Sequence, residues 1–459
     1  MDADVLLINP PDLRSKYKRF FGIKAPPLGL AYIAGVLEKQ NISVDILDCA
    51  ALDLDFNDLQ NRLKRKNNDL IGITSTTPTI PEALKTAEIA NETLDAKIAL
   101  GGPHPTFTHK QILRKNRFVD YVVRGEGEKT FLKLAKRIGP RNNVESIRGI
   151  SYRENGNIEV NPDREPIEEV DELPFPARHL LPNDEYQLFN IKMPLTTMIT
   201  SRGCPMQCQF CASSAMHGKE VRRRSPNDVV EEIEYVRDEF GIETVAFMDD
   251  TFTLFPDWVR EFTKKMKQKN LEMGWGCTAR ADKLDKNLLS EMKEAGCHTL
   301  FVGVESGVQG ILDNIQKGIN LKEIRRAFKV SRDLGIRTIA SLVLGLPGET
   351  KQSAKKTIEF VKEIKPDYAL FSIATPYPGT KFYEKAHKKD LIETNDWFKY
   401  NLFSAVLDNN LGIKKTKKLQ KKAFKKFYFR PTYILREIKK EGMPFLKVLK
   451  TIFNEIIYD

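Results

Sequence analysis

The chain has 459 residues, 41% of them hydrophobic, with six cysteines and a formal net charge of +11. This length and composition predict two or three domains with ordinary globular cores. No apolar run reaches the roughly 18 residues that a membrane-spanning helix needs. We expect no signal peptide, because the acidic start of the chain leads directly into a strand.

The cysteines indicate the cellular compartment of the protein, and the distribution of charge indicates which partners it can bind. The cysteines show no extracellular spacing pattern, which indicates a reducing compartment, so we expect a cytoplasmic protein. Lys and Arg outnumber Asp and Glu by 14 to 4 from Leu411 to Asp459, and residues 1–410 are therefore nearly neutral. Basic character confined to one end argues against a broad nucleic-acid-binding face, and nucleic acid is an unlikely partner.

Residues 1–140 alternate short apolar runs with helical stretches. The expected strands are residues 5–8, 43–47, 70–73, 98–100 and 119–123, with helices between them such as residues 81–94 and 126–138. This alternation predicts an α/β domain with a parallel, doubly wound, Rossmann-like sheet. Such sheets bind ligands beyond the carboxyl ends of their strands. The candidate binding loops are therefore residues 74–78, 101–105 and 124–128.

Residues 141–190 are expected to connect this domain to the next. Residues 147–160 have the pattern of a hairpin, in which Asn155-Gly156 is a favoured two-residue turn. Proline-rich sequence follows as far as Pro182, which is typical of a connector.

Three cysteines in a C-x3-C-x2-C spacing, Cys204, Cys208 and Cys211, are the most specific motif of the chain. Three thiolates this close can hold three irons of a cubane cluster and leave the fourth iron open to a small molecule. Three other interpretations compete. A zinc site would need a fourth ligand, for which His217 is the only nearby candidate; a disulfide would leave an odd thiol; and the spacing could arise by chance.

Residues 191–400 again alternate strands with helices. Strands are expected at residues 196–200, 244–248, 273–278, 299–304, 337–344 and 368–372, and a helix is expected to begin at Ser225-Pro226. In barrels of parallel strands the chemistry lies at the carboxyl ends of the strands. The candidate residues after the second to fifth strands are Asp249, Asp250, Arg280, Glu305, Ser306, Gly345 and Pro347.

Residues 401–459 form a basic tail in which aromatic side chains alternate with lysines. We expect a helix over residues 419–428, with Phe424, Phe427 and Tyr428 on one face, and a second helix from Phe445 to Ile457. A basic amphipathic helix suits an anionic membrane surface, and a basic aromatic segment could also bind RNA. The third interpretation is a helical cap on the barrel whose polar face is solvated.

The cysteine motif and the later motifs, which follow it in a set order along the chain, together resemble the radical S-adenosylmethionine (radical SAM) superfamily. The resemblance implies a partial (β/α)6 barrel and a 4Fe–4S cluster on Cys204, Cys208 and Cys211. SAM would chelate the open iron and be cleaved reductively to a 5′-deoxyadenosyl radical. Phe210 would pack over the ligand, and Asp249 and Asp250 would contact the SAM amino group, unless they cap a helix.

The later motifs complete this implied SAM site. Arg280 would hold the SAM carboxylate, with a salt bridge to Asp282 as the equal alternative. Glu305, in the Gly-x-Glu-Ser-Gly segment that includes Ser306, would contact SAM. The segment with Gly345 and Pro347 resembles the adenine-side motif.

The first domain resembles the cobalamin-binding domain that is fused to many radical SAM enzymes. The shared features are Asn9-Pro10-Pro11, a Pro-Leu-Gly-Leu helix start, a Ser/Thr loop, Gly-Gly-Pro-His and Gly-Glu-Gly-Glu. The implied cobalamin contacts are Ser75, Thr77, Gly101 and Gly102, with His104 as a further pocket residue. The Asp-x-His-x-x-Gly motif of one branch is absent, so no histidine from that position can ligate cobalt, and a packing domain without cobalamin is the alternative.

The hypothesis is a cobalamin-binding radical SAM enzyme that modifies an unactivated carbon by C-methylation, or by cyclisation or carbon–carbon bond formation. Phe427 to Pro431 resembles the tail of relatives that act on isoprenoid or porphyrin-like molecules. We therefore expect a hydrophobic substrate, a lipid or isoprenoid, delivered through peripheral contact of the tail with the inner face of the membrane. An electron donor such as flavodoxin or ferredoxin is implied.

Two alternatives remain open at this point. A tRNA-modifying methylthiotransferase would need a second cysteine triad in the first domain, where only Cys49 occurs, and a C-terminal β-barrel. A non-enzymatic iron–sulfur or cobalamin sensor would bind a partner through the basic tail.

Overall fold

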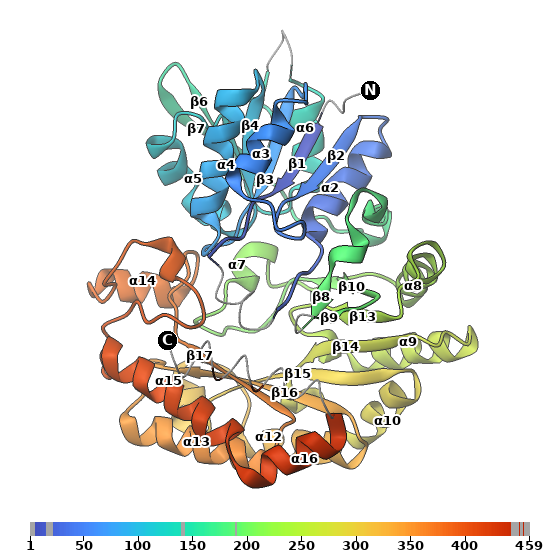
Figure 1. The fold of residues 1–459 in the computed structure, drawn as a ribbon, viewed down its shortest axis with the longest axis vertical. Helices are drawn as coiled ribbons and strands as arrows, with labels where there is room; N and C mark the ends of the chain where they lie inside the picture. The colour runs from blue at the N-terminus through green and yellow to red at the C-terminus, as the bar shows by residue number, and fades with distance from the viewer. Residues whose placement is uncertain are drawn as a thin grey trace.

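Two large sheets, one in each half of the chain, organise the molecule: the first is parallel except for β6 and β7, and the second is wholly parallel. Figure 1 shows one sheet lying above the other with α7 between them. The structure is a computed structural model that describes residues 5–14, 22–138, 143–188 and 191–441, together with residues 449 and 453. The predicted fold class, a doubly wound domain followed by a partial barrel and a helical tail, is confirmed.

The first sheet has the strand order β2-β1-β3-β4-β5-β6-β7. Its parallel part comprises β1 (Val5–Asn9), β2 (Val44–Asp48), β3 (Leu70–Thr74), β4 (Lys97–Gly101) and β5 (Tyr121–Val123). Successive strand residues face opposite sides, so Leu7 joins the core under α2 (Leu28–Glu38) and α6 (Glu128–Ala135), and Leu6 joins the opposite core. That second core lies under α3 (Phe56–Leu63), α4 (Ile80–Thr93) and α5 (Pro103–Lys115).

The predicted hairpin is part of the first sheet. It consists of β6 (Ile150–Glu154) and β7 (Asn157–Val160), and β6 pairs antiparallel with β5. Both turn residues have left-handed backbone angles, φ +47° at Asn155 and φ +83° at Gly156, as the Asn-Gly turn predicts. The proline-rich connector follows, and its short elements are η1 (Val170–Glu172), η2 (Arg178–Leu180), η3 (Asn183–Glu185), β8 (Gln187–Leu188) and β9 (Ile191–Lys192).

The second sheet is an open barrel of six parallel strands. In order across the sheet they are β10 (Leu195–Met198), β13 (Thr244–Phe247), β14 (Gly274–Ala279), β15 (Cys297–Glu305), β16 (Arg337–Leu344) and β17 (Tyr368–Ile373). Its core helices are α8 (Pro226–Phe240), α9 (Pro256–Gln268), α10 (Lys286–Glu294), α11 (Gln309–Asn314), α12 (Leu321–Asp333), α13 (Lys351–Ile364) and α14 (Lys381–Lys388). The Asp228 amide donates to Ser225 Oγ at 3.2 Å, which confirms the predicted start of α8.

The small elements beside the barrel mouth are β11 (Ser201–Arg202), α7 (Ser213–His217), β12 (Arg222–Arg223), η4 (Phe252–Leu254), η5 (Ala281–Lys283) and η6 (Trp397–Lys399). Of these, β11 pairs with β12 and so closes the loop that carries the three cysteines.

The tail supports the helical-cap interpretation. Helix α15 (Ile413–Tyr428) lies along β17, with Phe424 and Phe427 fully buried at 5.2 and 6.2 Å from the ring of Phe371. Pro431 ends that helix and begins α16 (Pro431–Glu441). The aromatic face that could have met a membrane or RNA therefore packs on the barrel. The expected helix from Phe445 to Ile457 falls almost wholly outside the described residues.

Candidate active site between the two domains

The cysteine loop is held in place by backbone hydrogen bonds to three parts of the barrel. The Cys204 amide donates to Gly218 O at 3.2 Å, the Gln209 amide to Ile315 O at 3.1 Å, and the Phe382 amide to Gln209 O at 2.9 Å. Gly203 has φ +97°, and a Cβ there would lie 2.1 Å from Glu220 O. The loop can therefore take this path only with glycine before the first cysteine.

The three cysteines differ in exposure but influence one another. Cys204 is buried, Cys208 is half-buried and Cys211 is exposed, and all three are free thiols. Burial raises the pKa of Cys204 and Cys208, and the neighbouring thiols raise it further. Among the described residues no three His, Cys, Asp or Glu side chains converge on one point as ligands of a single metal ion would. Three free thiols on one loop suit a cubane, in which each cysteine binds a different iron.

Glu305 has the least ordinary backbone of the predicted site residues. It ends β15 at an irregularity in the pairing with β16, and its φ of +59° lies in the left-handed region. Such conformations cost about 1–3 kcal/mol and gather at functional sites. Its side chain, in a 5% exposed residue, accepts a hydrogen bond from Lys317 Nζ at 2.7 Å. The strand end thus presents a buried carboxylate beside the cysteine loop, and its partner Lys317 was not singled out from the sequence.

Lys317 ties this carboxylate to the cysteines. Burial by itself would lower the pKa of Lys317, but the charges of Glu305 and Cys208 raise it. The same lysine and Arg280 act in the opposite direction on Cys208 and favour its thiolate. Gly303 leaves room for the pair, because a Cβ there would lie 2.7 Å from Lys317 Nζ. The arrangement gives a compact charged cluster next to the second cysteine.

The guanidinium group of Arg280 donates hydrogen bonds to three groups of the protein. Its Nη1 donates to Lys317 O at 3.1 Å, its Nη2 to Gly318 O at 3.3 Å and its Nε to Asp282 at 3.0 Å. The sequence left a salt bridge to Asp282 as the equal alternative to SAM binding, and that bridge is present. Arg280 therefore supports the loop that carries Lys317.

The two aspartates after β13 have different surroundings. The carboxylate of Asp249 is buried and accepts hydrogen bonds from the Thr200 amide at 3.1 Å, Thr200 Oγ1 at 2.7 Å and Ser201 Oγ at 2.6 Å. Asp249 therefore fixes Thr200 and Ser201, which lead into the cysteine loop. Asp250 is exposed and accepts from Ser213 Oγ. Of the two, Asp250 remains accessible to a ligand's amino group.

The remaining predicted SAM contacts lie at the ends of β15 and β16. Ser306 is fully buried and shares a 3.2 Å hydrogen bond with Thr357, so it joins the strand end to α13. Gly345 has φ +87°, and its amide donates to Glu349 at 2.5 Å. Pro347 is half-buried, and its carbonyl accepts from Asn314. Phe210 packs at the edge of the barrel core.

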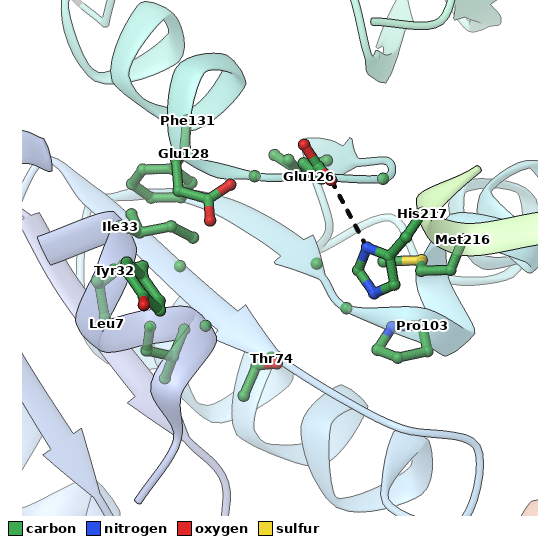
Figure 2. A pocket seen from close by; sticks show the side chains of 18 of the residues that line it. Leu7, Tyr32, Ile33, Thr74, Pro103, Glu126, Glu128, Phe131, Met216 and His217 are labelled. Carbon is green, nitrogen blue, oxygen red and sulfur yellow. Dashed lines mark ion pairs between the residues drawn. The ribbon is translucent and has the colours of Figure 1, made fainter. Parts of the chain in front are cut away.

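A cavity of about 330 Å³ lies between the domains and reaches into the first domain between its sheet and the α2–α6 layer. In Figure 2, Leu7, Ile33 and Phe131 lie on one side of it and Pro103, Met216 and His217 on the other. Gly72 lets Leu7 and Phe131 pack closely against the strand at the inner end, because a Cβ there would lie 2.7 Å from Leu7 and 2.8 Å from Phe131.

Two of the predicted cobalamin contacts line this first cavity, and three do not. Gly101 and Gly102 line it, and Gly102 (φ +98°) could not carry a Cβ, which would lie 2.6 Å from Ser75 O. Ser75 is buried beneath this turn. His104 bonds to Thr77 at 3.2 Å and meets the Trp397 ring edge-on at 4.8 Å, which places it in the contact between the domains. Burial lowers the pKa of His104 to about 4.

Charged residues from both domains form the rim of the first cavity. Glu126 accepts from Arg222 at 2.6 Å, and Glu128 accepts from Arg202 at 2.6 Å. His217 Nδ1 lies 3.7 Å from Glu126 and turns its ring toward the cavity (Figure 2). These contacts outweigh burial and hold the pKa of Glu126 below its usual range. The space therefore has an apolar, glycine-lined inner end and a polar rim.

A second cavity, of about 420 Å³, lies on the other side of Pro103, which lines both. The first domain contributes Asp12, Arg14, Thr76, Thr77, Pro78, Thr79, Glu82, Pro103 and Phe107; the barrel contributes Ala212, Tyr377, Pro378, Phe398, Asn401 and Leu402. Most of its wall is apolar. Ala212 directly follows the third cysteine, so this space borders the cysteine loop.

Two family models match the chain, the B12 binding domain over residues 20–135 and the radical SAM superfamily over residues 198–361. An uncharacterized methyltransferase of Pyrococcus horikoshii is 38% identical over 95% of this chain and 94% of its own length. The chain belongs to the radical SAM enzymes that carry a B12-binding domain.

More distant relatives and solved structures agree with this assignment. The anaerobic magnesium-protoporphyrin IX monomethyl ester cyclase of Rubrivivax gelatinosus is 28% identical over 83% of this chain and 70% of its own. The hopanoid C-3 methylase of Methylococcus capsulatus is 24% identical over 89% and 77%. The structure of the cobalamin-dependent SAM radical enzyme OxsB matches 98% of this chain and 70% of its own with a TM-score of 0.76 at 18% identity, and shows the same fold.

This radical SAM protein is thus an enzyme of the methyltransferase or cyclase type, and its family's cofactors are a 4Fe–4S cluster, SAM and cobalamin. The donor set on the cysteine loop fits the cluster, and the glycine-lined first cavity fits a cofactor that enters deep into the first domain. Sequence reasoning missed Gly72, Lys317 and the second cavity. Only Gly72 had a visible signal, a glycine inside an apolar strand.

Proposed function

We propose that this protein is a cobalamin-dependent methyltransferase that methylates an unactivated carbon of a hydrophobic substrate, a lipid or isoprenoid. The observation that carries the proposal is the pair of neighbouring cavities between the domains. The first suits cobalamin, and the second, mostly apolar, borders the cysteine loop. A substrate in the second cavity would lie within reach of both cofactor sites.

The cofactors supply, when bound, a 5′-deoxyadenosyl radical and a transferable methyl group. The residues of this chain would bind these cofactors at separate positions. Cys204, Cys208 and Cys211 would hold the cluster; Glu305, Asp250 and the turn at Gly345 would surround SAM; Gly101 and Gly102 would admit cobalamin. A flavodoxin or ferredoxin is the proposed electron donor.

Two features support the substrate class. The hopanoid methylase and the protoporphyrin ester cyclase, by their names, act on large, mainly hydrophobic molecules. The exposed face of α15 carries lysines such as Lys414, Lys418 and Lys422, and Leu435 on α16 is 70% exposed. Solvent-facing lysines and an exposed apolar side chain in the same tail favour an anionic bilayer. None of the described helices combines the length and the apolar character that a membrane span needs. Absence of flotation with anionic liposomes would count against membrane contact.

The alternative of a methylthiotransferase loses support from the structure. Cys49 is fully buried, and no second cysteine accompanies it in the first domain. The described part of the tail is helical and contains no β-barrel. Both features that this alternative requires are therefore missing from the described chain.

The test is anaerobic reconstitution with iron, sulfide and hydroxocobalamin, followed by addition of SAM and dithionite. We expect 5′-deoxyadenosine, bound cobalamin and, with a hydrophobic substrate extract, S-adenosylhomocysteine. Cys208→Ala should abolish deoxyadenosine because the cluster loses a ligand, while Cys49→Ala, away from the loop, should not. A wild-type protein with an intact cluster that forms no deoxyadenosine even with the extract would support the sensor alternative and contradict the proposal.

A further inference from the structure

One carboxyl group in the second cavity is not explained by the fold. Glu82 lies in the first turn of α4, and the residue is 4% exposed. Its Oε2 has no hydrogen-bond partner among the described residues. An unpaired buried polar group costs about 1–3 kcal/mol, so a fold gains nothing by keeping this one. Burial raises the pKa of Glu82 to about 7; a backbone hydrogen bond to the carboxyl group and the charge of Arg14 oppose the rise, and the charge of Asp12 adds to it.

The uncharged threonine and asparagine side chains of the cavity already have hydrogen-bond partners. Thr76 and Thr79 bond to each other at 3.1 Å, and Thr77 bonds to His104 at 3.2 Å. Asn401 donates to Phe398 O at 2.6 Å and accepts from the Phe403 amide at 2.9 Å. Glu82, by contrast, brings to the described wall a carboxylate oxygen without a hydrogen-bond partner.

The cavity gives this acceptor a defined position relative to the chemistry. Arg14 stacks over the ring of Phe398 at 4.6 Å, so the two domains meet beside Glu82. The wall includes the apolar or aromatic side chains of Phe107, Tyr377 and Leu402, and also Ala212 next to Cys211. A molecule anchored at Glu82 can therefore extend along an apolar wall toward the cysteine loop.

We propose that Glu82 recognises a hydrogen-bond donor, a hydroxyl or an amine, on an otherwise apolar substrate. This inference rests on the proposed function and specifies its substrate: a polar group at one end, and the reacting carbon on the apolar part. A few well-placed polar groups in an apolar pocket commonly set ligand orientation. A site built to bond a substrate donor also rejects analogues that lack it.

The test compares three isoprenoid probes that differ only at one end: farnesol, farnesylamine and farnesene. Equilibrium dialysis with the reconstituted enzyme should show at least tenfold tighter binding of farnesol or farnesylamine than of farnesene. Glu82→Leu should remove this preference, while Glu88→Gln should retain it, because Glu88 lies on the same helix with its side chain 42% exposed and paired with Lys85. If the amine is the true ligand, its affinity should rise from pH 6 to pH 8 as the carboxylate ionises. Affinity for farnesol should change little.

Equal binding of the three probes, or no binding, overturns the inference. Such a result leaves the proposed function intact if deoxyadenosine and S-adenosylhomocysteine still form, so the two failures are distinguishable. A ligand-free measurement adds a second check. Glu82→Gln should raise the melting temperature by about 2 °C or more at pH 8, and by less at pH 5, where the wild-type carboxyl is already neutral. A lower melting temperature at both pH values would assign Glu82 a structural role and overturn the inference.

Discussion

At the scale of single residues, the site depends on buried charges whose partners come from distant positions. Glu305 and Lys317 are 5% and 8% exposed and form a pair at 2.7 Å. Desolvating two charges is costly, so such a pair adds little net stability, but removing one partner strands the other. The pair therefore fixes the position of a carboxylate beside Cys208. The intact pair adds little to the free energy of unfolding, although each partner alone would be costly to bury.

We predict that Lys317→Met destabilises the protein by about 3–5 kcal/mol, because Glu305 stays buried without its counter-ion. The double variant Lys317→Met with Glu305→Gln should recover much of this loss, because no unpaired charge remains. Denaturant unfolding of the two single variants and the double variant measures the coupling. Lys322→Met, at an exposed position on α12, is the control and should change stability by less than about 0.5 kcal/mol. Independent, additive effects would show that the two side chains do not interact.

A functional role could be predicted from the sequence for residues that belong to a motif with a specific spacing. It could not be predicted for residues outside such a motif. The cysteine triad and Glu305 stood out because each follows a strand in a recognisable motif. Lys317 lies after α11 in no motif, and only the path of the chain brings it to Glu305. Asp249 was visible as an acid after a strand, but its commitment to Thr200 and Ser201 depends on a contact 48 or 49 residues away.

At the scale of elements, α15 and α16 complete the open edge of the barrel. Because β17 has a strand on one side only, its outer backbone groups need other partners. Tyr428 Oη donates to Ala369 O at 2.9 Å and accepts from the Ala369 amide at 3.0 Å. Gln420 donates to Phe371 O at 2.6 Å, and Tyr433 to Asp367 O at 2.5 Å. Side chains of the basic tail thus take the place of a neighbouring strand.

We predict that Tyr428→Phe destabilises the protein by about 1–3 kcal/mol, because it leaves the amide and carbonyl of Ala369 buried without a partner. The loss should appear in thermal or urea unfolding and be accompanied by a greater tendency to aggregate through the exposed strand edge. Lys422→Ala, at an exposed position on the same helix, should behave like the wild type. If both variants unfold like the wild type, the helix does not protect the edge.

Element order was more predictable than element role. The strands of both sheets followed from apolar runs a few residues long, and their order from the alternation with helices. The tail was predicted as helical from its pattern, but that pattern is the same for a membrane-surface helix and for a barrel cap. Whether an aromatic face is buried depends on a free edge at β17, more than 50 residues earlier in the chain.

At the scale of the whole molecule, buried ion pairs join the two domains around the first cavity. Glu126 and Glu128 come from the first domain, and Arg202 and Arg222 from the start of the barrel. Farther out, Arg178 of the connector meets Glu232 of α8 at 2.8 Å. These contacts were beyond prediction from the sequence, because charged residues are common and nothing in their spacing identifies which domain they face. They set the relative position of the domains, and so the width of the cofactor space.

We predict that Arg222→Met weakens binding of hydroxocobalamin by about 2 kcal/mol or more, roughly thirtyfold in Kd. The substitution leaves Glu126, in an 8% exposed residue, beside the cavity without its bidentate partner, and the domains should separate or rotate to hydrate it. Adding Glu126→Gln should restore part of the affinity, since the rim then no longer contains a buried carboxylate whose nearest cations, Arg202 and His217, are 3.7 Å away. Arg148→Met breaks the exposed pair with Glu165 and should leave the Kd within about threefold. Titration of the protein with hydroxocobalamin, followed by absorbance, measures each value. An unchanged affinity in Arg222→Met would mean that the cobalamin space is shaped within the first domain alone, and that the buried pairs serve only to attach the barrel.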